Sequence, residues 1–101
     1  MWVLATQDGA EFPFTFRILG GSIKTVGRAP RADFIVDAPL VSRLHCRLTA
    51  GAAEVEVLDL DSTNGTYVNG KRVERATLRG GDRLGVGRVE LTVTRADDSR
   101  T

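Results

Sequence analysis

Short runs of alternating apolar and polar residues recur along this chain. The stretches "VEVLDL" (55–60) and "VELTVTR" (89–95) alternate with a period of two. In the second stretch, Val89, Leu91 and Val93 share one face of an extended chain, and the residues between them share the other. Such alternation is typical of half-buried β-strands. Similar short runs predict further strands at 2–6, 14–18, 22–27, 34–36, 46–50, 66–68 and 82–87.

Turn signals separate these runs, and no window of about a dozen residues shows sustained helical periodicity. Eleven glycines and three prolines interrupt the 101 residues, a length that suits one small domain. Many short strands joined by turns favour an all-β fold, either an antiparallel sandwich or a barrel. We assign residues 1–96 to this domain and expect the polar residues 97–101 to form a flexible tail.

The charge balance and the cysteine content exclude several classes of function. Fourteen Lys and Arg residues oppose thirteen Asp and Glu residues, so the formal net charge is +1. This balance gives no reason to expect nucleic acid or a membrane as a partner, and any anion must be recognised by local geometry. Cys46 is the single cysteine, and no cysteine–histidine cluster has metal-site spacing. We expect no disulfide, no metal and no cofactor, and expect Cys46 to be a small buried apolar residue.

The location follows from what the chain lacks. It shows no signal-peptide pattern and no apolar run of membrane-spanning length. A single cysteine fits a reducing compartment. We therefore expect a cytoplasmic protein.

Four connecting stretches hold residues that plain turns do not need. They are "VGRAPRADF" (26–34), "SRLHC" (42–46), "DSTNGTYVNGKRV" (61–73) and "GGDRLGVG" (80–87). Strands cross a sandwich from end to end, so turns that are distant in sequence can become neighbours at one end. If the first three stretches share an end, they bring together a guanidinium, hydroxyls, a side-chain amide and free backbone N–H groups. This inventory suits a phosphate ester.

Individual side chains support this interpretation. Arg28 offers a planar fork of donors for two phosphate oxygens. Ser42 and Thr63 each offer an O–H donor. The amide of Asn64 can donate to and accept from a peptide backbone, which would hold an extended ligand in register.

A catalytic interpretation of Ser42 and His45 has little support. The chain has no Gly-x-Ser-x-Gly turn, and His45 is its only histidine. The glycines of "GGSIKTVGR" (20–28) are not followed by Gly-Lys-Ser/Thr and a helix, which argues against a nucleotide-binding loop. We expect no enzymatic activity.

Taken together, three blocks of sequence resemble a forkhead-associated (FHA) domain. They are "VGRAPRADFIVDAPLVSRLHCRL" (26–48), "LDLDSTNGTYVNGKRV" (58–73) and "LRGGDRLGVGRVEL" (78–91), and they cover most of residues 22–93. The resemblance implies a sandwich of about eleven strands in two twisted, mostly antiparallel sheets. It also implies a phosphothreonine-dependent peptide-binding module in Ser/Thr kinase signalling, without catalysis. The implied partners are a phosphothreonine-containing protein and an upstream Ser/Thr kinase.

The same resemblance assigns expected roles to residues of the loops. Those expected to bind the phosphopeptide are Arg28 and Ser42 on the phosphate, Thr63 and Arg43 as further phosphate contacts, and Asn64 on the ligand main chain. Those expected to structure the loops are His45, which braces them, and Gly27 and Gly65, whose turns leave little space for a side chain.

Alternatives to these assignments stay open at this point. Arg28 could be a surface arginine paired with Asp33 or Asp37. Both Asn-Gly pairs are typical of hairpin turns; we expect Asn69-Gly70 to be only a turn and Asn64 to form a turn and also bind ligand. Candidates for selecting residues around the phosphothreonine, acidic ones in particular, are Ser62, Arg31, Arg43 and Lys71.

Two other functions compete with phosphopeptide binding. The first is a structural FHA-like domain that associates with another protein independently of phosphate, although such a domain would not need Arg28, Ser42 and Asn64 together. The second is nucleic-acid binding, which neither the balanced charge nor any aromatic–basic stretch supports. The oligomeric state is left open.

Overall fold

The computed structural model describes residues 1–96, so the expected tail at 97–101 lies outside the described residues. Regular structure within residues 1–96 consists of β-strands, and this part of the chain contains no helix that could cross a membrane. The strands are β1 (Trp2–Ala5), β2 (Thr15–Ile18), β3 (Ile23–Gly27), β4 (Phe34–Ile35), β5 (Cys46–Ala50), β6 (Val55–Asp59), β7 (Thr66–Val68), β8 (Lys71–Val73), β9 (Arg75–Leu78), β10 (Arg83–Val86) and β11 (Val89–Arg95).

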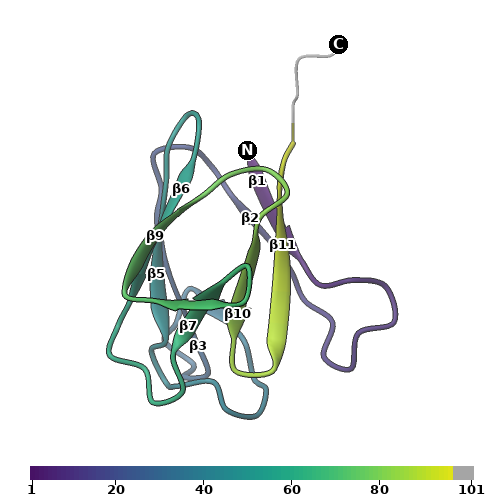
Figure 1. The fold of residues 1–101 in the computed structure, drawn as a ribbon, viewed down its shortest axis with the longest axis vertical. Coiled ribbons are helices and arrows are strands. Elements are labelled where there is room, and N and C mark those ends of the chain that lie inside the picture. The colour runs from purple at the N-terminus through teal and green to yellow at the C-terminus, as the bar shows by residue number, and fades with distance from the viewer. Residues whose placement is uncertain (97–101) are drawn as a thin grey trace.

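These strands form two sheets packed face to face (Figure 1). One sheet has six strands in the order β2-β1-β11-β10-β7-β8, and the other has five in the order β4-β3-β5-β6-β9. Neighbouring strands are antiparallel throughout, except that β3 and β4 are parallel. The prediction of an all-β sandwich of about eleven strands in two mostly antiparallel sheets is confirmed.

Two strands, β8 and β9, were not among the strands predicted from the apolar–polar pattern. Each lies at the edge of a sheet, where one side of the strand has no neighbour. Both are short; β8 exposes Lys71 and Arg72, and β9 begins with the exposed Arg75. Edge strands of natural proteins carry charges because these discourage pairing with other chains, and the same charges hide the alternation that marks a strand.

The two Asn-Gly pairs behave differently. Asn69 and Gly70 join β7 to β8 with φ of 50° and 85°, as a two-residue hairpin turn requires. The expectation that Asn64-Gly65 also forms a hairpin is wrong, because β6 and β7 belong to different sheets. The 60–65 loop instead carries the chain from one sheet to the other.

The core lies between the inner faces of the sheets. Its fully buried side chains alternate along the strands, as the period-two pattern predicted. Cys46, as expected, is buried and packs in this core. Phe16 of β2 stacks on Phe34 of β4 with ring centroids 4.7 Å apart, which closes the side of the sandwich where these two edge strands meet.

The strand register determines which loops share an end of the sandwich. Val26 near the end of β3 pairs with Cys46 at the start of β5, and Cys46 pairs with Asp59 at the end of β6. In the other sheet, the start of β7 pairs with the end of β10, next to the β10–β11 turn. The loop from β6 to β7 joins these two groups at one end, drawn at the bottom of Figure 1, and the termini lie at the other. The first three of the four chemically unusual stretches therefore each contribute residues to this end of the sandwich.

Candidate functional site

Backbone hydrogen bonds tie the β3–β4 and β4–β5 connections together at this end. The N–H of Arg28 donates to the carbonyl of Ser42 at 2.9 Å, and the N–H of Ala29 donates to the carbonyl of Arg43 at 3.0 Å. The N–H of Thr63, in the 60–65 loop, donates to Oγ of Ser42 at 3.0 Å. Because that Oγ accepts here, its own hydrogen stays available to a ligand. Arg28 and Thr63 are thus each hydrogen-bonded to Ser42, although the three residues come from three different loops.

The side chains of Arg28 and Asn64 are each held by one backbone carbonyl. Arg28 Nε donates to the carbonyl of Val41 at 3.1 Å, and Asn64 Nδ2 donates to the carbonyl of Leu40 at 3.1 Å. Both side chains belong to exposed residues. The bond at Nε leaves the two terminal nitrogens of the guanidinium for an anion.

The alternative role of Arg28 as an ion-pair partner does not occur in the structure. Asp33 instead accepts hydrogen bonds from the N–H and hydroxyl of Thr25 at 2.8 and 3.2 Å, and these bonds to Thr25 help to lower the pKa of Asp33. The ion pairs formed within residues 1–96 join Arg79 to Glu54 and Arg88 to Glu11. Arg28 therefore pairs with neither Asp33 nor Asp37.

His45 connects the β4–β5 connection to the 60–65 loop. Its ring is fully buried, Nδ1 accepts the N–H of Ser42 at 3.0 Å, and Nε2 lies 2.8 Å from the carbonyl of Gly65. A backbone N–H can only donate and a carbonyl can only accept, so Nδ1 carries no proton and Nε2–H donates to Gly65. This geometry is that of a brace between loops, and the buried ring does not reach the surface.

Asp59, at the end of β6, organises the 60–65 loop through hydrogen bonds that its carboxylate accepts. One carboxylate oxygen accepts the hydroxyls of Ser62 at 2.5 Å and Thr66 at 2.7 Å, and the other accepts the N–H of Ser62 at 3.2 Å. Desolvation by burial would raise the pKa of Asp59, but the hydrogen bonds from Ser62 and Thr66 outweigh it and the pKa is lowered. The ionised carboxylate therefore shapes the loop.

Ser62 does not face a ligand, and the expectation that it selects residues around the phosphothreonine is wrong. Only 7% of Ser62 is exposed, its hydroxyl donates to Asp59, and the same oxygen accepts the N–H of Gly65 at 3.0 Å. Arg31, Arg43 and Lys71 are exposed and stay candidates for contact with the ligand.

Two glycines are required where loops pass close to other groups. A side chain at Gly27 would overlap the carbonyl oxygen of Arg43, so no other residue permits the pairing of the β3–β4 and β4–β5 connections. Gly65 has a φ of 91°, and a methyl group there would lie 2.6 Å from Nε of Arg72. Arg72, which the sequence patterns did not single out, therefore lies against the 60–65 loop.

Cys46 follows His45 but faces the core and takes no part in the surface of the site. Burial, with a smaller contribution from the nearby charge of Asp59, raises the pKa of its thiol to about 12. A thiol with this pKa stays protonated and unreactive near neutral pH.

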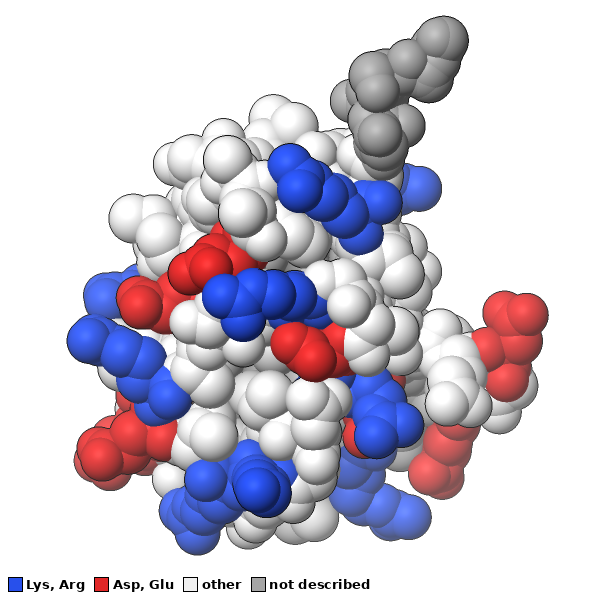
Figure 2. Space-filling view, turned by 45° about the horizontal axis from the view of Figure 1, so that its top comes forward, with Lys and Arg blue, Asp and Glu red and all other residues white. Residues whose placement is uncertain are grey.

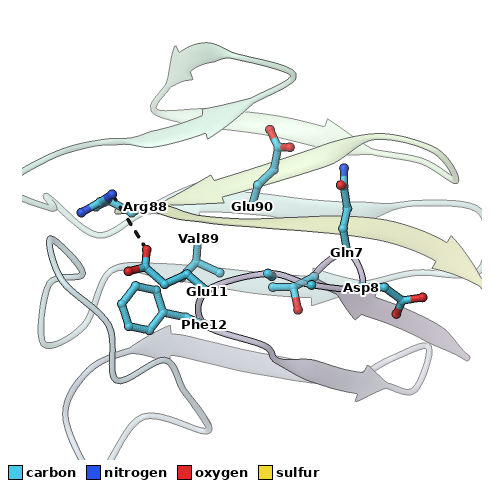
Figure 3. Close-up of a pocket in the computed structure, with 10 residues that line it drawn as sticks. Gln7, Asp8, Glu11, Phe12, Arg88, Val89 and Glu90 are labelled. Atoms are coloured by element: carbon cyan, nitrogen blue, oxygen red, sulfur yellow. Dashed lines mark ion pairs between the residues drawn. The ribbon is translucent and has the colours of Figure 1, made fainter.

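Several hollows lie near this end of the sandwich, and two of them are larger than the one lined by Tyr67, Gly70, Gly85 and residues 87–90. One of about 380 Å³ is lined by Arg28 and residues 37–41, so it adjoins the predicted phosphate contacts. The other, of about 320 Å³, lies between the β1–β2 loop and the β10–β11 turn, where Arg88 is 3.9 Å from Glu11 (Figure 3). The second contains none of the predicted site residues, so we associate only the first with ligand binding.

Figure 2 tilts the end that carries the termini toward the viewer and the loops of the candidate site away from the viewer. On the face shown in Figure 2, basic and acidic side chains are interspersed over the surface. A face of uniform positive charge would have indicated binding to a polyanion or to a membrane surface. The face in this view carries both signs of charge.

The structure brings all five predicted ligand-binding residues to one end of the sandwich, on connections that follow β3, precede β5 and follow β6. A rigid β-sandwich that presents polar side chains on its end loops is typical of a ligand-binding module. The chain belongs to the FHA domain family, whose model matches residues 24–87. Members of this family are binding modules.

Curated relatives and solved structures agree with this membership. The glycogen accumulation regulator GarA of Mycolicibacterium smegmatis is 40% identical over 78 residues, which are 74% of this chain and 49% of the relative. The FHA domain of the CT664 protein from Chlamydia trachomatis superposes with a TM-score of 0.86 at 25% identity, covering 95% of this chain and 98% of that one.

A second FHA structure, from a study of phosphothreonine-dependent FHA domain interactions, has a TM-score of 0.83 at 30% identity and covers 95% of this chain and 97% of its own. The chain spans about half the length of the first curated relatives it matches.

Proposed function

We propose that this chain binds phosphothreonine in an extended segment of a partner protein, through Arg28, Ser42, Arg43, Thr63 and Asn64. The observation that supports this most is the hydrogen bond from the N–H of Thr63 to Oγ of Ser42, together with the bond from the N–H of Arg28 to the carbonyl of Ser42. These bonds gather a guanidinium and a hydroxyl around one point at the surface, with the amide of Asn64 in the same loop as Thr63. A Ser/Thr kinase would phosphorylate the threonine of the partner protein, and the module itself performs no catalysis.

Each group has a distinct task in this proposal. The terminal nitrogens of Arg28 bind two phosphate oxygens, and the hydroxyl of Ser42 donates to one of them. Arg43 and Thr63 add further contacts at the rim. Asn64 bonds the main chain of the ligand beside the phosphothreonine and fixes its register.

The expected affinity follows from these contacts. Phosphothreonine carries a charge of about −1.5 to −2 near neutral pH. Each charge-assisted hydrogen bond contributes roughly 1.5–3 kcal/mol, and ordering a flexible peptide offsets part of the sum. A dissociation constant of about micromolar results.

The test compares an oriented peptide library with a fixed phosphothreonine against its unphosphorylated twin by fluorescence anisotropy. Wild type should bind only the phosphorylated library, and Arg28→Ala should weaken binding more than about tenfold because one arginine supplies two of the phosphate bonds. Arg17→Ala is the matched control, since Arg17 is exposed on β2 and its side chain forms no hydrogen bond or ion pair within residues 1–96. Equal affinity of Arg28→Ala and wild type would refute the assignment of Arg28.

The same experiment separates the competing function. Binding of a partner that is unaffected by phosphate and by Arg28→Ala would indicate a domain that associates through another surface. Phosphothreonine-dependent binding lost in Arg28→Ala would exclude that alternative as the main function of this end of the sandwich.

A further inference from the structure

Residues 39–41, in the connection between β4 and β5, bind two side chains of the proposed site, Arg28 and Asn64. The carbonyl of Leu40 accepts from Asn64 Nδ2, and the carbonyl of the next residue, Val41, accepts from Arg28 Nε, each at 3.1 Å. These carbonyls belong to adjacent residues. A shift of segment 39–41 therefore displaces Arg28 and Asn64 together.

The backbone of this segment is in a conformation that its residues do not prefer. Leu40 has a φ of 71°, in the left-handed region where a side chain with a Cβ is rarely found. Leu40 is 54% exposed, so packing in the core does not hold it there. Strained backbone of this kind persists only where the surroundings impose it.

The β10–β11 turn supplies such a support. Gly87 has a φ of 59°, and a Cβ on it would lie 2.7 Å from the carbonyl oxygen of Pro39 and 2.9 Å from the carbonyl carbon of Leu40. Both of these are backbone atoms, which cannot rotate away as the end of a side chain can. Gly87 therefore lets the turn pack directly behind segment 39–41, and any larger residue would push the segment outward.

We propose that Gly87 is a positioning residue for ligand binding and that the β10–β11 turn sets the placement of Arg28 and Asn64 through segment 39–41. Within residues 1–96, no hydrogen bond or ion pair joins the turn to either side chain. It acts by fixing two successive carbonyls, to which the guanidinium and the amide are bound. The relevance to a phosphopeptide rests on the proposed function, whereas the mechanical coupling does not.

Gly87→Ala tests the coupling, with Gly81→Ala as the matched control. Gly81 lies in the β9–β10 turn with a φ of 93°, but a Cβ there would meet nothing within 4 Å. Both variants place a Cβ on a residue with positive φ, at 59° for Gly87 and 93° for Gly81, and only Gly87→Ala also presses on segment 39–41. The first readout is the NMR signal of Arg28 Nε–H and of the Asn64 side-chain amide in the ligand-free protein. The second is the affinity for the phosphothreonine peptide library.

Gly87→Ala should shift both NMR signals and weaken phosphopeptide binding by about tenfold or more, since both anchoring side chains move. Gly81→Ala should leave the signals in place and the affinity within about twofold of wild type. Unchanged signals in folded Gly87→Ala would overturn the inference. Failure of wild type to bind any phosphopeptide would instead overturn the proposed function, and the ligand-free signals would still decide the coupling.

A second variant keeps the inference testable if Gly87→Ala does not fold. Asn64→Ala removes the bond to the carbonyl of Leu40 from an exposed position, so this variant is expected to fold. If segment 39–41 couples the two side chains, the signal of Arg28 Nε–H should shift in this variant. Asp61→Asn, in the same loop, should leave that signal unchanged. An unchanged Arg28 Nε–H signal in Asn64→Ala would contradict the coupling.

Discussion

Replacing His45 by alanine removes the side chain that joins the β4–β5 connection to the 60–65 loop. The imidazole is fully buried and makes two hydrogen bonds, from the N–H of Ser42 at 3.0 Å and to the carbonyl of Gly65 at 2.8 Å. Alanine makes neither bond, so both backbone groups lose their partner. The buried carbonyl of Gly65 is the more costly of the two, because water reaches it less easily.

The magnitude can be worked out from these contacts. A buried polar group left without its partner costs about 1–3 kcal/mol, and the half-buried N–H of Ser42 falls at the low end of this range. The cavity left by the ring adds about 1–2 kcal/mol. The sum is about 3–6 kcal/mol, a large share of the roughly 5–15 kcal/mol by which a domain is stable. The corresponding fall in melting temperature is at least about 12 °C.

The measurement is urea denaturation of His45→Ala beside wild type, followed by phosphopeptide anisotropy at a temperature where both are folded. The loops should lose their mutual orientation, so the affinity of the folded variant should also fall. Cys46→Ala is the control, because it removes a buried atom from the core at the next position without touching either loop bond. A destabilisation by His45→Ala of less than about 1 kcal/mol would refute the assignment of His45 as a brace.

Three further predictions follow from buried or crowded groups. Gly27→Ala should destabilise by more than about 3 kcal/mol in urea denaturation, because the new methyl group collides with the backbone at Arg43, while Gly80→Ala, with nothing within 4 Å, should change little. The lowered pKa of Asp59 means that its ionised form contributes stability that is complete above its unfolded-state pKa of about 3.9 and is lost as the pH falls through the folded-state value. Asp59→Asn should therefore flatten the acid limb of a plot of unfolding free energy against pH, and an unchanged slope would contradict this account. Cys46, with its pKa raised to about 12, should resist thiol reagents in the native protein near neutral pH and react fully in denaturant; rapid native labelling would show that the thiol is accessible.

The central strands could be predicted from the sequence because each has its own alternating pattern. The runs at 55–60 and 89–95 correspond to β6 and β11, whose inner residues are fully or almost fully buried. The edge strands β8 and β9 could not be predicted in this way. They contact the core with few side chains and carry exposed charges, so period-two alternation is weak along them.

The candidate site could likewise be predicted only in part from the sequence. The residue types at positions 28, 42, 63 and 64 indicate anion chemistry wherever the chain places them, and the FHA resemblance links them to one another. Their distances are not a property of the sequence. Arg28 and Ser42 are hydrogen-bonded only because β3 and β5 pair with Val26 opposite Cys46, and Thr63 joins them only because the 60–65 loop crosses between the sheets.

What the sequence by itself determined is the class of fold, the strands of the core and the identity of the chemical groups at the binding end. Only the tertiary structure decided how those groups are held. Ser62 turned inward to Asp59, whereas the carbonyls of Leu40 and Val41 turned toward Asn64 and Arg28, with Gly87 packed behind them. The physical reason is that every residue has the same backbone carbonyl and N–H. Side-chain patterns report which residues are buried, but the direction in which a carbonyl points depends on loops that meet only after the sheets have paired.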